Sequence, residues 1–221
     1  MTGASPLVRC DAVRRVYRAG AAELVALRDV GCAVGARELI AVTGPSGSGK
    51  STLLHLLAGL DRPTAGSVCW PALQHPLRPS GIAVVFQGPS LLAPLDVAEN
   101  VALPLLLLGA DDREAREQAM RALERVDMAD LAGRLPEELS GGQAQRVAVA
   151  RALVSGPRLI LADEPTGQLD QASAGQVIDL LVEAARSLGA ALVVSTHDAG
   201  VAGHFPVRWR MDHGSLVAGA A

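Results

Sequence analysis

Residues 44–51 read GPSGSGKS, a glycine-rich stretch that fits the pattern G-x-x-x-x-G-K-[ST]. It follows an apolar stretch at 38–43 (ELIAVT), typical of a buried strand, and opens a helix predicted over 50–58 and ended by Gly59. In a loop between a strand and a helix, glycines let the backbone turn its N–H groups inward, and the first helical turn adds partial positive charge. Such a loop binds phosphate, so the stretch predicts a nucleotide-binding α/β fold built around a parallel sheet.

The basic residues of the chain point to the same loop. Lysine and arginine together number 20, and because Lys50 is the only lysine, the other 19 are arginine. A compact ammonium fits between phosphate groups where the wide, planar guanidinium group does not. We therefore expect Lys50 to reach the β- and γ-phosphates of ATP, and Ser51 to ligate Mg²⁺.

Two adjacent acids end a second predicted strand. Residues 158–164 read RLILADE, which places Asp163 and Glu164 at the carboxyl edge of the sheet, where open α/β sheets bind their ligands. Asp163 is expected to hold Mg²⁺, and Glu164 to act as general base toward the attacking water. Two acids after a strand also occur as an ordinary solvated loop, but the glycine-rich loop favours the catalytic interpretation.

Strands and helices alternate at both ends of the chain, which predicts a parallel sheet with covering helices. An antiparallel strand pair is predicted at the N-terminus, and the middle of the chain is helical and resembles an insertion. The predicted antiparallel strands are 7–17 and 23–34, with a turn at Gly20, Ala21 and Ala22; further strands are 81–86, 191–195 and 207–211; further helices are 97–108, 112–126, 141–153 and 171–188.

Composition limits the class of protein. The chain has 221 residues, 49% of them hydrophobic, which suits one domain with an inserted subdomain. The net charge of −3 gives no basic footprint for nucleic acid, so no nucleic-acid partner is expected. The most apolar stretch, 101–110, is interrupted by Pro104 and is far shorter than the ~20 residues that span a bilayer, which predicts a soluble protein. The three cysteines lack C-x-x-C spacing and are expected to be buried or half-buried thiols.

A loop and a pair of acids alone define a P-loop NTPase, which could be a kinase, a GTPase or a motor. The stretch at 139–143 reads LSGGQ and continues AQRVAVARAL. By itself Ser140-Gly141-Gly142 is a helix start with an N-cap serine. With the other motifs, however, the chain resembles the ATP-binding cassette family, whose signature this is. The resemblance implies an ATPase with a RecA-like P-loop core, an N-terminal antiparallel β-subdomain and an inserted helical subdomain.

The resemblance covers nearly the whole chain and implies further roles. It gives Tyr17 as the aromatic that stacks on adenine, Gln87 as the glutamine that contacts Mg²⁺ or the water, and His197 as the histidine that touches the γ-phosphate. The expected catalytic residues are Glu164, His197 and Gln87, and the expected metal ligands are Ser51, Gln87 and Asp163. Residues expected to contact the nucleotide are Tyr17, Gly44, Pro45, Ser46, Gly47, Ser48, Gly49, Lys50, Ser51, Thr52, Ser140, Gly141, Gly142, Gln143 and Asp170.

The resemblance also implies partners. It places one cassette domain over 1–221, with a nucleotide-binding core at 1–87 and 157–221 and a helical subdomain at 88–156. Two copies would form a head-to-tail homodimer that energises a separate integral-membrane permease from the cytoplasmic face of the cell membrane. The leucines near 87–109 would either contact that permease or be buried within the insertion. The stretches ADEPTGQLD and SLLAPLDVAENVALPLLLLG resemble the lipoprotein-releasing, macrolide-export and cell-division group, which implies extrusion.

Two other functions stay open at this point. One is a cassette ATPase without a transport role, and the other is a regulatory subunit that binds ATP without hydrolysing it. Only 20 residues separate Gly66 from Gln87, fewer than the family commonly has, and the proline-rich stretch 70–78 resembles a trimmed loop.

Overall fold

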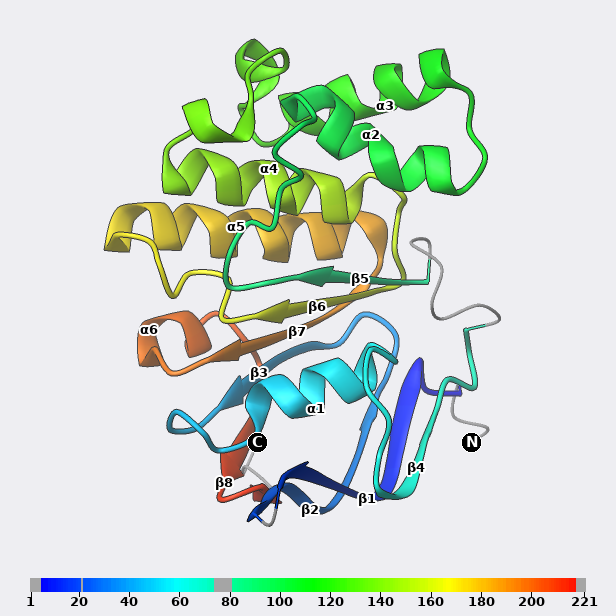
Figure 1. Ribbon diagram of the computed structural model, residues 1–221, viewed down its shortest axis with the longest axis vertical. Coiled ribbons are helices and arrows are strands. Elements are labelled where there is room, and N and C mark those ends of the chain that lie inside the picture. Colours follow the sequence, from blue (N-terminus) through cyan, green and yellow to red (C-terminus); the bar gives the residue numbers. More distant parts are fainter. Residues whose placement is uncertain (1–4, 21, 74–80, 218–221) are drawn as a thin grey trace.

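The structure is a computed structural model that describes residues 5–20, 22–73 and 81–217. Within these residues, a six-stranded sheet has the strand order β5-β6-β7-β3-β8-β9 (Figure 1). Neighbouring strands are parallel except β8 and β9, which form an antiparallel hairpin. The strands are β3 (Leu39–Thr43), β5 (Ile82–Val85), β6 (Leu159–Asp163), β7 (Ala191–Thr196), β8 (Val207–Asp212) and β9 (Ser215–Val217). The predicted α/β fold with a parallel sheet is confirmed, whereas β9 was not predicted.

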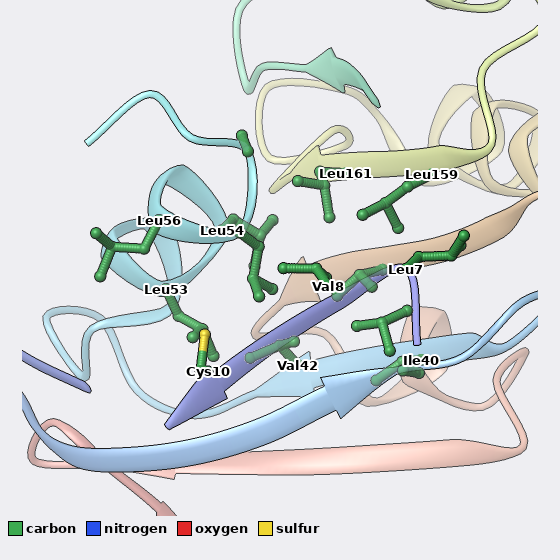
Figure 2. Packing of buried hydrophobic residues seen from close by; sticks show 14 of the residues in the cluster. Leu7, Val8, Cys10, Ile40, Val42, Leu53, Leu54, Leu56, Leu159 and Leu161 are labelled. Carbon is green, nitrogen blue, oxygen red and sulfur yellow. The ribbon is translucent and has the colours of Figure 1, made fainter. Parts of the chain in front are cut away.

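The central strands β3, β6 and β7 are buried on both faces: successive side chains along a strand point to opposite sides, and each side is covered. Ile40 and Val42 of β3 pack beneath helix α1 (Lys50–Leu57), together with Leu159 and Leu161 of β6 (Figure 2). The intervening residues pack on the other face against helix α5 (Gln171–Leu188). The central strands therefore read as continuous apolar runs, which is how they could be recognised in the sequence.

A second sheet, antiparallel, packs against the face of the main sheet that carries α1. Its order is β2-β1-β4, built from β1 (Val8–Ala19), β2 (Ala22–Val34) and β4 (Ala65–Cys69). The predicted pair of long strands is confirmed, although Ala21 of the predicted turn lies outside the described residues. Strand β4 was not predicted from the sequence.

The remaining helices lie on the opposite side of the main sheet from α1 (Figure 1). They are α2 (Val97–Leu107), α3 (Asp112–Glu124), α4 (Gly141–Leu153), α5 and the short α6 (Ala199–Ala202), with single 3₁₀ turns at Ala129–Leu131 and Pro136–Glu138. Helices α2, α3 and α4 share a hydrophobic cluster of their own, in which Val101, Leu123 and Val147 are fully buried. This cluster fits an inserted helical layer, while its proposed boundaries at 88 and 156 stay a prediction.

Two expectations concern the surface of the chain. Among the described residues, none of the helices combines the length and apolar character that a membrane crossing requires. The predicted trimmed loop at 70–78 falls mostly on 74–80, which lies outside the described residues.

Candidate active site

The predicted chemical residues follow the carboxyl ends of neighbouring parallel strands. Gln87 follows β5, Asp163 ends β6 with Glu164 next, and His197 follows β7. The glycine-rich loop follows β3, which pairs with β7. Because parallel strands end at one edge of a sheet, these segments converge there, at the edge predicted for Asp163 and Glu164.

The glycine-rich loop is held by close packing against two other strands. A Cβ atom added to Gly44, whose φ is 146°, would lie 2.2 Å from the carbonyl oxygen of Met211 in β8. One added to Gly49, whose φ is 101°, would lie 2.5 Å from the carbonyl oxygen of Ala26 in β2. Any side chain at these positions would displace backbone, so glycine is required for the loop to lie this close to both sheets.

Lys50, the only lysine, is buried inside this loop with a relative exposure of 4%. Its Nζ donates to the carbonyl oxygens of Gly44 at 2.9 Å and Pro45 at 3.1 Å, and lies 3.3 Å from Glu164 Oε1. A buried ammonium needs such partners, because an unpaired charge in a protein interior is strongly unfavourable. The ammonium of Lys50 therefore contacts both the glycine-rich loop and Glu164, the catalytic acid predicted after β6.

The Asp163 carboxylate accepts hydrogen bonds from two serine hydroxyls. Ser51 Oγ donates to Asp163 Oδ1 at 3.0 Å, which joins the two side chains predicted as metal ligands. Ser195 Oγ, fully buried at the end of β7, donates to the same oxygen at 2.5 Å. His55 Nε2 of α1 lies 4.0 Å from Asp163 Oδ2. Neither Ser195 nor His55 was predicted, although a serine ending the apolar run ALVVS was a visible signal.

Glu164 has an unusual backbone conformation, with φ at 44° in the left-handed region. Its N–H donates to Ser195 Oγ at 2.9 Å, and its Oε2 lies 2.9 Å from His197 Nδ1. Left-handed backbone at a non-glycine residue costs about 1–3 kcal/mol and persists where surrounding contacts hold it, most often at functional sites. Here those contacts come from Ser195 in β7 and from His197, which follows that strand.

Ser51 and Asp163 bring oxygen atoms, the ligand type that Mg²⁺ prefers, to this edge of the sheet. Among residues 5–20, 22–73 and 81–217, no group of three or more His, Cys, Asp and Glu side chains could hold a metal ion. Mg²⁺ is commonly bound by one or two protein oxygens, with phosphate oxygens and water completing its shell. Ser48 Oγ, in the glycine-rich loop, is buried without a hydrogen-bond partner in the described part of the chain, which leaves a polar group available to a ligand.

Gln87 is placed beside the segment that carries Glu164. A Cβ atom added to Gly167 would lie 3.0 Å from Gln87 Nε2. The preceding carbonyl, that of Phe86, accepts a hydrogen bond from Gln145 Nε2 of α4 at 3.0 Å. The strand end that carries Gln87 is therefore in contact with both the β6 edge and the helical layer.

The predicted signature residues lie elsewhere in the chain. Ser140 and Gln143 cap α4 reciprocally, with Gln143 N donating to Ser140 Oγ at 3.3 Å and Ser140 N donating to Gln143 Oε1 at 2.9 Å. Asp170 caps α5, accepting from the N–H groups of Ala172 and Ser173. Helices α1 and α4 lie on opposite sides of the six-stranded sheet (Figure 1), so the chain does not bring its own signature residues to its own phosphate loop.

Tyr17 lies on β1, close to where β2 contacts the glycine-rich loop through Ala26. Its ring is partly exposed, and its hydroxyl donates to Asp61 Oδ2 at 2.8 Å. The remaining predicted contacts, Pro45, Ser46, Gly47 and Thr52, belong to the loop and the first turn of α1. The structure thus groups the loop, the acids, Gln87 and His197 in one place, and separates 140–143 and Asp170 from the loop.

Comparisons with known proteins agree with this geometry. Residues 27–167 match the ABC transporter family. The chain is 42% identical over 219 residues to the lipoprotein-releasing system ATP-binding protein LolD of Chromohalobacter salexigens, covering 95% of this chain and 92% of that protein. The LolD protein of Legionella pneumophila is 43% identical over 211 residues, which cover 91% and 93% of the two chains. A dimeric post-hydrolysis structure of the ATP-binding cassette MJ0796 bound to ADP and Pi superposes with a TM-score of 0.87 at 35% identity, covering 95% and 96%.

Proposed function

The chain belongs to the ABC transporter family, and from this premise we propose that it is the ATP-hydrolysing subunit of a transporter, working as a head-to-tail homodimer on a separate membrane permease. The observation that carries the proposal is the convergence of four strand ends. They bring the hydroxyl of Ser51 to 3.0 Å from the Asp163 carboxylate, and the ammonium of the single lysine to 3.3 Å from that of Glu164.

Each group at this edge has a distinct task in the proposal. Main-chain N–H groups of 44–51 and the ammonium of Lys50 bind the phosphates of ATP. Ser51 and Asp163 hold Mg²⁺, with Gln87 as a third oxygen donor. When bound, that ion neutralises charge on the phosphate oxygens during phosphoryl transfer.

Glu164 accepts a proton from the attacking water. Its carboxylate is oriented by His197 at one oxygen and by Lys50 at the other, which leaves its remaining lone pairs to face the water. The left-handed backbone held by Ser195 aims the side chain toward the loop instead of along β6. A fixed orientation matters, because a general base must lie within hydrogen-bond reach of the proton it removes.

The separation of 140–143 from the phosphate loop supports the dimer. The start of α4 presents the N–H groups of Gly141 and Gly142 beyond the Ser140 cap, which is an anion-binding arrangement. In a two-fold assembly each copy would place these groups, with Gln143 and Asp170, on the ATP held by its partner. ATP would then join the subunits, and hydrolysis would release them.

The transport task follows from the relatives and from one apolar surface. Leu107 at the end of α2 is 74% exposed, and Leu106 and Leu108 are 37% and 39% exposed, whereas Leu105 is buried. We propose that these three leucines contact a permease, which would place the chain peripherally on the cytoplasmic face of the cell membrane. The two LolD relatives are named for lipoprotein release, so lipoproteins or similar lipophilic cargo are the proposed substrate class.

Replacing the proposed general base tests this function. We expect Glu164→Gln to retain ATP binding but to lower phosphate release by about 10²- to 10⁴-fold, the usual contribution of general-base catalysis. ATP binding is measured by calorimetry, phosphate release by a colorimetric assay and dimer accumulation by size-exclusion chromatography. Glu117→Gln on the exposed face of α3 is the matched control. Near-normal turnover by Glu164→Gln would refute the assignment, and wild-type binding of ATP without phosphate release would favour a regulatory subunit.

A further inference from the structure

Three side chains form a cluster around the only tyrosine of the chain. Arg15 and Tyr17 lie two residues apart on β1, so their side chains share one face of the strand. The Arg15 guanidinium lies over the Tyr17 ring, 4.4 Å from its centroid. Asp61 Oδ2 accepts from both, at 2.8 Å from Arg15 Nε and 2.8 Å from the Tyr17 hydroxyl. The ring is therefore held both at its edge and across one face.

Asp61 lies in the turn that follows helix α1, the helix that the phosphate loop opens. The N–H groups of Leu60 and Asp61 both donate to the carbonyl oxygen of His55 in α1, at 2.9 and 3.4 Å. The first residue of that helix is Lys50. The carboxylate that holds Tyr17 thus lies in the turn after the helix whose first residue carries the ammonium proposed to hold phosphate.

The same segment is joined to β1 by main-chain contacts. Thr64 N donates to the carbonyl oxygen of Arg14 at 2.7 Å, and Val16 N donates to Thr64 Oγ1 at 3.0 Å. On β1 these bonds involve residues 14 and 16, one on each side of Arg15. They fix the distance between β1 and the end of α1, so that Asp61 meets the tyrosine hydroxyl without further adjustment.

We propose that Arg15 and Asp61 are positioning residues that hold the Tyr17 ring as a platform for adenine, with the face opposite Arg15 left for the base. This inference rests on the proposed function and deepens it. A half-exposed tyrosine otherwise samples several rotamers, and ordering it when a ligand binds would cost affinity. A ring fixed in advance avoids that cost, and a guanidinium on its far face favours the stacked arrangement electrostatically.

The charges in the cluster are consistent with this arrangement. Partial burial raises the pKa of Asp61, but hydrogen bonds from Tyr17 and the N–H of Arg62, together with the charge of Arg15, lower it overall below its ordinary value. The carboxylate is therefore ionised at neutral pH and accepts from the tyrosine hydroxyl as a charged group, which makes a stronger hydrogen bond than a neutral acceptor does.

The experiment separates adenine recognition from phosphate recognition. Binding of Mg²⁺-ADP and of Mg²⁺-pyrophosphate is measured by calorimetry on the wild-type chain, Tyr17→Phe and Asp61→Asn. Asp11→Asn, which breaks the exposed Arg9–Asp11 pair on the same strand, is the matched control. We expect both test variants to bind ADP about 3- to 10-fold more weakly, the factor for ordering one side chain, with pyrophosphate affinity and the control unchanged.

A spectroscopic measurement checks the ring itself. Because Tyr17 is the only tyrosine, 3-fluorotyrosine labelling gives a single ¹⁹F resonance. We expect this resonance to shift in nucleotide-free Asp61→Asn and to stay in place in Asp11→Asn.

The outcomes are distinguishable. A wild-type chain that binds neither ligand would overturn the proposed function. A wild-type chain that binds ADP, with variants that bind it equally well, would overturn the positioning role. Equal losses of affinity for ADP and pyrophosphate would also overturn the positioning role, because Asp61 would then act through the fold of α1. An unshifted ¹⁹F resonance in Asp61→Asn would overturn it as well.

Discussion

At the scale of single residues, substitutions of Lys50 test whether ATP binding requires only a positive charge or the compact shape of an ammonium. It is buried, and its ammonium contacts two carbonyl oxygens and the carboxylate of Glu164. Lys50→Ala should weaken ATP binding by about 2–5 kcal/mol, as removal of a buried charge partner does elsewhere. Lys50→Arg should weaken it to a similar degree, because the guanidinium is wider and planar. Fluorescent-nucleotide titration measures both, with exposed Arg113→Lys as control. Wild-type affinity in Lys50→Arg would contradict the need for a point charge.

The residues that sequence reasoning found and those it missed differ in how they are encoded. The phosphate loop and the acids after β6 are contiguous, so their spacing alone indicated phosphate chemistry. Ser195, His55 and Asp61 act through side-chain contacts with site residues that lie at least 31, 108 and 44 positions away, respectively. The local sequence around such residues does not indicate their partners. Their contacts depend on how the fold places β7 and the end of α1 beside the site.

At the scale of elements, helix α4 holds the segment that carries Gln87. Arg151 donates from its guanidinium to the carbonyl oxygens of Ser90 at 2.9 Å and Pro89 at 3.1 Å, while Gln145 donates to that of Phe86. Burial lowers the pKa of Arg151, but arginine stays protonated at any physiological pH. The signature helix and the glutamine segment therefore form one connected unit.

We expect Arg151→Lys to break that unit, because an ammonium cannot reproduce the forked pair of hydrogen bonds. The loss of the two hydrogen bonds should lower the free energy of unfolding by about 1–3 kcal/mol, because one such bond contributes about 0.5–1.5 kcal/mol. It should also lower the rate of ATP hydrolysis more than ATP affinity, since Gln87 would be less well held. Urea unfolding and steady-state kinetics measure these effects, with exposed Arg116→Lys as control. An equal loss in affinity and rate would contradict the link to Gln87.

The predicted boundaries of helices and strands match the structure where a local sequence signal begins or ends the element. The predicted helices 141–153 and 171–188 match α4 and α5, because Ser140 and Asp170 cap them and Gly189, with φ at 64°, ends α5. Strands β4 and β9 were missed for the opposite reason. Residues Ala65–Cys69 read AGSVC, too short and too weakly apolar to stand out, and β4 forms only because β1 offers its edge. Strand β9 likewise depends on its hairpin with β8.

At the scale of the whole molecule, the two halves of the proposed ATP site lie on different sides of one sheet. The phosphate loop opens α1 on one side, and 140–143 open α4 on the other (Figure 1). No local rearrangement of loops would join them within a chain, since the sheet is buried on both faces between them. A two-fold pair of chains solves this by exchanging the two surfaces, and it creates two equivalent sites.

Complementation between two inactive variants tests that exchange. Lys50→Ala removes the phosphate-binding ammonium, and Ser140→Arg fills the start of α4 with a bulky cation. Each variant alone should be inactive, because every site in its homodimer is damaged. In a mixed dimer, one site combines both defects and the other combines an intact loop with an intact helix start. Random exchange makes about half the dimers mixed, so an equal mixture should recover about one quarter of wild-type phosphate release.

Titrating one variant against a fixed amount of the other measures this recovery, and Arg113→Lys mixed with Lys50→Ala is the control for simple dilution. No recovery, with mixed dimers present by mass spectrometry, would show that each chain completes its own site and would overturn the head-to-tail arrangement.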